Sequence, residues 1–254
     1  MHTLRTATRV RIIGLIMFGL VGFSFRASTG QEKPTYKLTG SEATLAGTVS
    51  FVGRPPEPKR VDMSADPICE TLNPDSLIDW GVVVTNDRLR DVLVYVRGQH
   101  LDVYSFEASS PYVTLEHRRC RYLPHVLGIQ TQQTLKILNN DETMHNTHAV
   151  AKVNPDWNQT QVPGSALQHR FALPEILFPM KCNQHPWERA VVAVFPHPFF
   201  SVSGTDGSYK ISGLPPGQYT IVAWHELLGE QTVDVFLAGS EQRTLDFTFK
   251  ASGH

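Results

Sequence analysis

Residues 180–188, with the sequence MKCNQHPWE, decide how the rest of the chain is interpreted. They place a thiol, Cys182, three residues before an imidazole, His185, and an apolar run of strand length follows at 190–195. A second imidazole, that of His145, lies some forty residues upstream and would arrive from a distant strand. One thiolate and two imidazoles form the trigonal donor set that binds copper in electron-transfer proteins. The stretch therefore predicts a metal site on a framework of strands.

Apolar and β-branched runs of strand length, separated by turn residues, recur along the whole chain, and no segment carries a long helical period. The predicted strands cover residues 43–52, 80–85, 92–96, 112–115, 126–129, 134–138, 190–195, 209–211, 219–224, 232–237 and 244–249. Residues 174–179 are bracketed by prolines and predict a strand or a loop. The pattern indicates an all-β protein of the sandwich or barrel type.

Several segments together resemble the cupredoxin, or blue copper, family: residues 122–126 (YLPHV), 134–141 (TLKILNND), 144–146 (MHN) and 180–182, with the strand that follows. In that family an apolar strand ending in Asn is followed by a His-Asn pair. The resemblance implies a cupredoxin-like Greek-key β-sandwich over residues 111–197. It also implies that His145, Cys182 and His185 are copper ligands and that Asn146 ties adjacent loops together.

The sequence departs from the family at Glu188, where relatives with a His-Pro-Trp-Met ending have methionine. Glu188 is therefore a candidate axial ligand, and a carboxylate is a hard donor that would favour Cu(II). The alternatives are Met180, Met144, the carbonyl of Met144 or no axial ligand. Cys, two His and Glu would also suit tetrahedral zinc, so zinc stays open as the metal. A single available thiol argues against a dinuclear copper site.

The C-terminal part carries a second resemblance. Residues 206–220, DGSYKISGLPPGQYT, resemble the carboxypeptidase regulatory-like, or transthyretin-like, module, and residues 47–49 supply the Gly-Thr-Val strand that opens such a module. The resemblance implies a smaller transthyretin-like or Ig-like β-sandwich. Residues 44–110 and 198–250 would form it together, and the copper domain would be inserted between them.

The N-terminus reads as an export signal over residues 1–30. Three arginines precede the apolar run 12–25, and small residues follow. Residues 31–43 predict a flexible lead-in. We expect a periplasmic or secreted protein without a membrane span in the mature chain, although an uncleaved N-terminal anchor stays open.

Three cysteines are an odd number for an exported chain, so at least one of them is not half of an internal disulfide. The economical assignment pairs Cys69 with Cys120 and leaves Cys182 as a metal thiolate. Three unpaired cysteines are the alternative.

Residues around the predicted ligands have supporting roles. Pro186 and Trp187 would stiffen and shield the turn, and an exposed edge of His185 would carry electrons out. His148 would lie beside the site rather than bind the metal. The other histidines singled out by the sequence, His125, His197 and His225, have no assigned role, and a second metal site at His125 or His148 stays open.

The formal net charge of −1 gives no basic field, and the cluster Arg118, Arg119 and Arg121 predicts a solvated loop, so nucleic acid is not expected as a partner. No orienting group or oxyanion donor accompanies Cys182 and His185, which argues against a thiol enzyme. The favoured function is that of an exported mononuclear type 1-like copper protein, a one-electron carrier or redox module with a redox partner protein. A non-redox β-sandwich binding or structural module with a zinc or empty Cys-His2 site is one alternative. Periplasmic copper storage or delivery is another.

Overall fold

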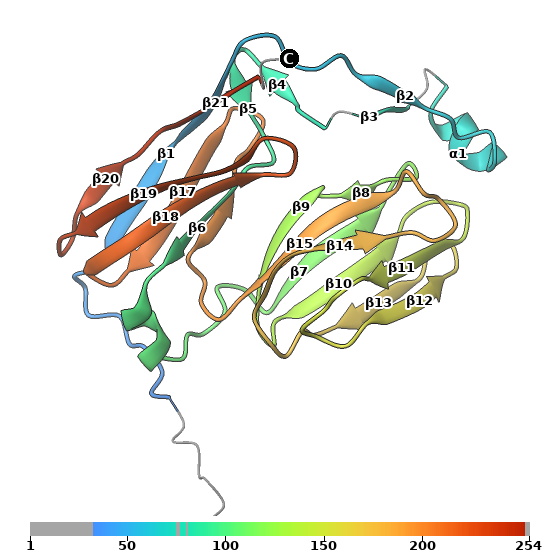
Figure 1. Ribbon diagram of the computed structural model, residues 1–254. Coiled ribbons are helices and arrows are strands. Elements are labelled where there is room, and N and C mark those ends of the chain that lie inside the picture. The colour runs from blue at the N-terminus through green and yellow to red at the C-terminus, as the bar shows by residue number, and fades with distance from the viewer. Residues whose placement is uncertain (1–32, 75–76, 80, 252–254) are drawn as a thin grey trace, which may run out of the picture. The chain divides into compact units, whose positions relative to one another are not determined.

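The computed structural model describes residues 33–74, 77–79 and 81–251, and the predicted export signal lies outside this range. The described chain consists mainly of strands, so the predicted all-β fold class is confirmed (Figure 1). Among the described residues, no helix has the length and apolar character needed to cross a membrane.

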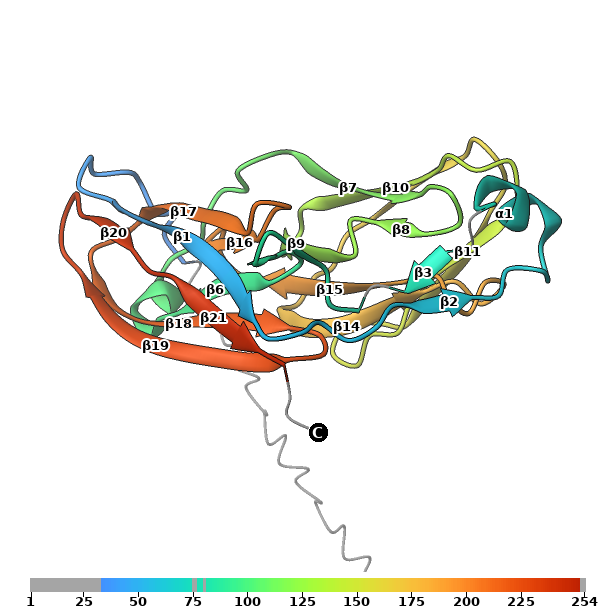
Figure 2. The ribbon, with the colours of Figure 1, turned by 90° about the horizontal axis from the view of Figure 1, so that it is seen from above.

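Residues 112–195 form a sandwich of two sheets, which Figure 2 shows as separate layers. One sheet has the order β13-β10-β7-β8 and the other β12-β11-β14-β15-β9. The strands are β7 (Tyr112–His117), β8 (Tyr122–Leu123), β9 (Val126–Gln130), β10 (Thr134–Asn139), β11 (His145–Ala149), β12 (Trp157–Gln161), β13 (Ala166–His169), β14 (Glu175–Lys181) and β15 (Arg189–Phe195).

The apolar patterns of these strands place the core between the two layers. In β10, Leu135 and Ile137 are fully buried, and the alternate residues face outward in part, as a half-buried strand requires. β15 is buried along nearly its whole length because it is central and pairs with β14 on one side and β9 on the other. Two parallel pairings, β7 with β10 and β9 with β15, make both sheets mixed.

The second sandwich combines strands from both ends of the described chain. One sheet has the path β17-β1-β5-β4 with β20 and β21 beside β1, and the other has the order β16-β6-β18-β19. The strands are β1 (Ala43–Val52), β4 (Val84–Thr85), β5 (Arg88–Leu89), β6 (Leu93–Arg97), β16 (Phe200–Val202), β17 (Ser208–Leu214), β18 (Gly217–His225), β19 (Gly229–Leu237), β20 (Gln242–Thr244) and β21 (Phe247–Lys250).

Gly47 of the predicted Gly-Thr-Val strand has a structural reason to be glycine. A Cβ atom at this position would lie 1.8 Å from the carbonyl oxygen of Leu245. That close approach falls between β20 and β21, which both pair with β1 in parallel. The predicted single strand 244–249 is therefore interrupted at Leu245 and Asp246.

The segment between β1 and β6 contains a helix that the sequence analysis did not predict. β2 (Lys59–Val61) pairs with β3 (Leu77–Asp79), and α1 (Pro67–Leu72) lies between them in the chain, while the 3-10 helix η1 (Gln99–Val103) follows β6. Asp66 caps α1 by accepting hydrogen bonds from the amides of Ile68 and Cys69, and Pro67 occupies the first turn, where a missing N–H costs nothing. Only strands were predicted in this region, at 80–85 and 92–96, and leaving out a helix was wrong.

Candidate metal centre

The ends of β11 and β14 and the turn before β15 supply the predicted ligands. His145 is the first residue of β11, and Cys182 directly follows β14. The chain then folds back, because the Cys182 amide donates to the carbonyl of Glu188 (3.1 Å) and the Glu188 amide donates to the carbonyl of His185 (2.8 Å). This tight turn brings residues three and six positions apart to one point.

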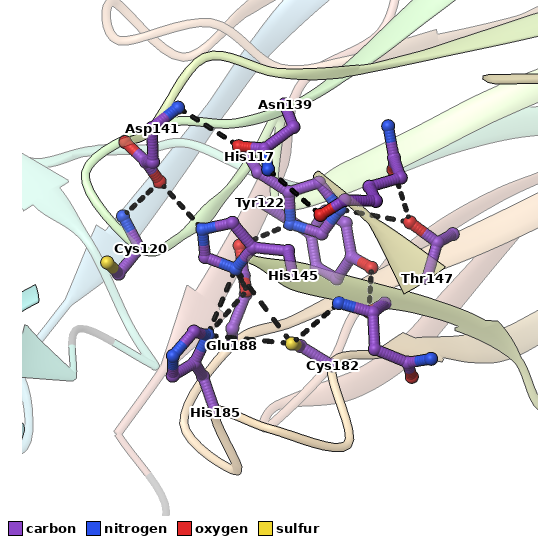
Figure 3. Close-up of polar contacts among 12 residues, drawn as sticks. His117, Cys120, Tyr122, Asn139, Asp141, His145, Thr147, Cys182, His185 and Glu188 are labelled. Carbon is purple, nitrogen blue, oxygen red and sulfur yellow. Dashed lines mark hydrogen bonds and ion pairs between the residues drawn. The ribbon is translucent and has the colours of Figure 1, made fainter. Parts of the chain in front are cut away.

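Four buried donor atoms converge there, as Figure 3 shows. The Nδ1 atoms of His145 and His185 are 3.0 Å apart, and the Sγ atom of Cys182 lies 3.9 Å and 3.6 Å from them, respectively. The Oε2 atom of Glu188 is 2.8 Å from His145 Nδ1 and 3.8 Å from His185 Nδ1. All four predicted residues are thus brought together.

Two carboxylates orient the two imidazoles. Asp141 Oδ2 lies 3.0 Å from His145 Nε2, and Asp66 Oδ2 lies 3.0 Å from His185 Nε2. Burial acts to raise the pKa of each aspartate, but hydrogen bonds from the histidine and from backbone amides outweigh it and lower the pKa, so both groups are anionic acceptors. Each Nε2 therefore carries a proton, and in the neutral rings each Nδ1 points a lone pair into the centre.

A buried chain of polar groups fixes the carboxylate of Glu188. Gln161 donates from Nε2 to the carbonyl of Ile137, so its Oε1 accepts the hydroxyl proton of Thr147 (2.8 Å). Thr147 Oγ1 must then accept from Nε2 of His117 (3.0 Å), whose Nδ1 lies 2.8 Å from Glu188 Oε1. This contact holds Oε1 against His117, and the other oxygen, Oε2, is turned toward the donor atoms.

The environment favours the anionic form of the thiol. The amide of Asn146 donates to Cys182 Sγ (3.3 Å). Burial raises the pKa of Cys182, but hydrogen bonds with His145 and His185 outweigh this effect and lower it to about 7. In the metal-free protein the histidines gain protons in exchange. Burial opposes this gain, yet contacts with Asp141, Cys182 and Glu188 raise the pKa of His145 to about 11.

His185 behaves in the same way. Burial acts to lower its pKa, and contacts with Cys182, Glu188 and Asp66 raise it to about 10. The buried centre therefore requires positive charge, which protons supply when no cation does.

These donors fit a metal ion. Bond lengths near 2.0 Å to nitrogen and 2.3 Å to sulfur, at trigonal or tetrahedral angles, imply donor separations of roughly 3.3–3.8 Å. The separations of 2.8–3.9 Å bracket that range. Glu188 Oε2 is buried and lies 2.8 Å from His145 Nδ1 and 3.8 Å from His185 Nδ1, so it faces the same point as the other donor atoms. A buried carboxylate oxygen in this position is costly unless a positive charge lies beside it.

The supporting residues lie around this centre. Asn146 Oδ1 accepts from the amide of Asn183 (3.2 Å), which ties two loops together. Trp187 donates its indole N–H to the carbonyl of Cys120 (3.2 Å), and its ring centroid lies 5.2 Å from that of His185. His148 faces Asn183 and Asp156 instead of the donor atoms.

The two methionine alternatives lie in other surroundings. Met144 is 46% exposed, and Met180 belongs to the apolar core of the first sandwich. The expected exposed edge of His185 is wrong. Only 3% of its surface is accessible, because Asp66, at the start of α1, covers its outer nitrogen.

The three histidines without an assigned role lie elsewhere. His125 contacts Glu226 Oε2 (2.7 Å) and the carbonyl of Arg189 (3.2 Å). His197 and His225 accept hydrogen bonds from nearby backbone amides, and burial lowers the pKa of each to about 4.

The arginine cluster lies at the surface as predicted, with Arg118 and Arg119 exposed and Arg121 partly exposed. Arg118 and Arg121 close the β7–β8 hairpin, but Arg119 donates twice to the carbonyl of Leu72 and thereby holds the end of α1.

Three site residues escaped the sequence analysis. His117 lies two residues after Leu115 in the same strand, so period-two alternation alone indicates that it faces the core. Asp66 carried a local signal, because Asp-Pro is a common helix start, but nothing local connects it to His185. Asp141 lies directly after the predicted strand and its Asn pair, within the segment that carries the family resemblance.

Asp141→Asn is expected to weaken metal binding by roughly 10- to 100-fold, the usual cost of losing a carboxylate behind a ligand histidine. The amide cannot accept from His145 and from the amides of Arg119 and Cys120 as the carboxylate does. Competition with a chromophoric chelator measures the affinity. Asp246→Asn, at an exposed carboxylate that accepts from the Thr48 amide, is the matched control. If the two variants bind the metal ion with equal affinity, Asp141 does not orient His145 for metal binding.

No protein-family model matches the chain, and no curated protein matches it. Among solved structures, a methionine-to-alanine variant of amicyanin in its Cu(I) form matches at 21% identity, covering 35% of this chain and 86% of that chain, with a TM-score of 0.30. The purple cupredoxin from Nitrosopumilus maritimus matches at 20% identity, covering 32% of this chain and 98% of that chain, with a TM-score of 0.29.

An oxidized proline-to-glycine variant of amicyanin also matches, at 20% identity over 35% of this chain and 86% of that chain, with a TM-score of 0.31. Scores this low carry no functional weight, so the donor set itself has to support a function. The predicted transthyretin-like character of the second sandwich stays a prediction.

Proposed function

We propose that the protein is a mononuclear type 1-like copper protein that carries single electrons, alone or as the redox module of a larger assembly. The observation that carries this proposal is the convergence of His145 Nδ1, His185 Nδ1 and Cys182 Sγ in a buried site where two carboxylates fix both imidazole tautomers. When bound, copper would supply a centre that alternates between Cu(I) and Cu(II) with a thiolate and two imidazoles around it.

The chain's own residues would keep that centre rigid and dry. The ligand atoms come from strand ends and from a turn closed by two backbone hydrogen bonds. His145, Cys182, His185 and Glu188 are at most 3% exposed, so water is largely excluded. Asp66 and Asp141 hold the rings in place, which limits the rearrangement that accompanies a change of charge.

Electrons would pass on the Cys182 side rather than through His185. A surface hollow of about 420 Å³ is lined by Lys181, Cys182, Asn183, Pro186 and Arg189, so it brings a ligand residue close to solvent. A redox partner protein docking over this hollow would come near the thiolate. His185, in contrast, lies under Asp66.

The remaining predictions stay part of this proposal. Residues 111–197 would be the copper domain, and residues 44–110 with 198–250 would form a carboxypeptidase regulatory-like sandwich that carries it. The disulfide between Cys69 and Cys120 suits a periplasmic or secreted protein.

Zinc is the second candidate, and Glu188 is the observation that favours it. Oε2 of Glu188 completes a Cys-His2-Glu set, which suits a closed tetrahedral zinc site that only stabilises the fold. The zinc and copper alternatives can be distinguished by redox activity, because zinc has no accessible redox couple.

Addition of Cu(II) to the purified metal-free protein tests the proposal. A thiolate-to-copper charge-transfer band in the visible range, saturating at one ion per chain, is expected, together with a reversible one-electron wave in voltammetry. Stoichiometric binding of zinc, with no band and no wave after copper is added, would favour the structural alternative.

A further inference from the structure

Helix α1 covers the outer side of His185 and is joined to the rest of the site through Asp66. Oδ2 of Asp66 accepts from His185 Nε2, while Oδ1 caps the helix at the amides of Ile68 and Cys69. Cys69 itself is fully buried, and its Sγ atom lies 3.7 Å from His185 Nε2. One half of the disulfide therefore lies directly against a proposed ligand.

The other half of the disulfide stands in the same relation to the second imidazole. Cys120 lies in the β7–β8 turn, and its amide donates to Asp141 Oδ2 (2.7 Å). That same oxygen lies 3.0 Å from His145 Nε2. The Cys69–Cys120 bond thus links helix α1, which Asp66 caps, to the β7–β8 turn, whose Cys120 amide holds Asp141 (Figure 3 shows the Cys120 side).

The other contacts that hold α1 and its cap are hydrogen bonds, each weaker than a covalent bond. Thr143 Oγ1 donates to Asp66 Oδ2 (2.8 Å). Arg119 donates to the carbonyl of Leu72 in exposed hydrogen bonds, and Asn73 donates to the carbonyl of Arg119 at 3.3 Å. The apolar cluster beneath the helix consists of Met63 and the two cysteines, with Val61, Leu72 and Trp187 packed against it. A cluster of this size gives a short helix little independent stability.

We propose that the Cys69–Cys120 disulfide is a redox-controlled lock on the metal site. Its reduction frees α1, withdraws Asp66 from His185 and lowers the affinity for the metal ion. This inference rests on the metal-binding part of the proposed function but not on electron transfer.

The chemistry requires a two-electron reductant, such as a small dithiol. One dithiol sulfur attacks a cysteine sulfur and forms a mixed disulfide, and the second displaces the remaining cysteine. The dithiol becomes a cyclic disulfide, and Cys69 and Cys120 receive its two electrons and two protons as two thiols.

Metal binding and the disulfide affect each other to the same extent. If the metal ion binds more tightly to the protein with the disulfide intact, the bound ion must favour the intact disulfide by the same factor. A bound metal ion, by holding His185 against Asp66, keeps the buried disulfide covered and slows its reduction.

Zinc affinity provides the first test, because Zn(II) neither oxidises the thiols nor depends on a copper redox couple. Competition with a chromophoric chelator should show that C69S/C120S binds Zn(II) roughly 10- to 100-fold more weakly than the wild type. Val235→Ala, a truncation of a buried residue in β19, is a control for general destabilisation and should leave the affinity unchanged. Affinities of the wild type and C69S/C120S within twofold of each other would overturn the lock.

The second test uses the wild-type chain, so it does not depend on whether the double variant folds. A water-soluble phosphine reduces the disulfide with and without excess Zn(II), and alkylation followed by mass spectrometry counts the thiols. Bound zinc should slow reduction at least tenfold. Equal rates would contradict the inference.

Asp66→Ser distinguishes two ways in which bound zinc could protect the disulfide: through the contact between Asp66 and His185, or only by blocking access of the reductant. Serine retains a cap for α1 but lacks the carboxylate oxygen that reaches His185. At saturating zinc, the variant should lose most of the protection of the disulfide against reduction, whereas full retention would overturn the role of Asp66.

If copper shows no reversible couple while zinc protects the disulfide, the electron-carrier proposal fails and the lock stands. If the wild type binds no zinc, the lock fails.

Discussion

Cys182→Ser should abolish the visible charge-transfer band that Cu(II) gives with the wild-type protein, since the band requires a sulfur ligand. The substitution is nearly isosteric. The serine oxygen can accept from the Asn146 amide as the sulfur does, so the metal-free variant should fold with a loss of about 1 kcal/mol or less. Absorption spectroscopy after copper addition and thermal unfolding without metal measure the two effects.

His148→Ala is the matched control for this experiment, because His148 neighbours the site but faces Asn183 and Asp156. Its band should equal that of the wild type. A band that survives in Cys182→Ser, or disappears in His148→Ala, would place the metal elsewhere.

Glu188→Gln should keep the fold and change the metal site. The glutamine oxygen can still accept from His117, while the new amide nitrogen points N–H groups at the donor atoms that should face a cation. We expect Cu(II) affinity to fall by at least about tenfold. The reduction potential should rise, because a hard anionic donor that stabilises Cu(II) is lost.

Glu175→Gln controls for the loss of a buried carboxylate. Glu175 is 8% exposed and accepts from the amides of Lys152 and Asn154, outside the donor set. Electron paramagnetic resonance and voltammetry compare the two variants. A spectrum and a potential for Glu188→Gln that match the wild type would show that Glu188 does not touch the ion.

The strands of the first sandwich that could be predicted are those with an apolar face. The pattern in residues 134–138 comes from a buried face and marks β10 within one residue. β12 and β13 were missed because their residues are mostly exposed, which leaves no apolar alternation to detect. Of residues 174–179, left between strand and loop, all but Pro174 belong to β14, even though Pro179 lies within the strand.

Local spacing indicates that three of the four converging residues meet, whereas His145, 37 residues before Cys182, was placed with them by the family resemblance. Cys182, His185 and Glu188 are held by one turn, so the sequence alone indicates that they meet. The partners behind them were not predictable, since His185 meets Asp66 across 119 residues and Glu188 meets His117 across 71. Such pairs depend on the tertiary packing of α1 and β7, which no short motif encodes.

The burial of His185 illustrates the same limit. An exposed edge of His185 was expected from the sequence as the electron exit, whereas an unpredicted helix with an aspartate cap covers it. The disulfide that holds this helix followed from cysteine arithmetic, but its position against the ligand required the fold.

X-ray absorption at the copper edge, on protein loaded with one equivalent of copper, tests the central claim most directly. We expect one sulfur near 2.2–2.3 Å and two imidazole nitrogens near 2.0 Å, with the sulfur signal absent in Cys182→Ser. A wild-type spectrum with only nitrogen and oxygen neighbours would contradict the assignment of His145, Cys182 and His185 as the ligands.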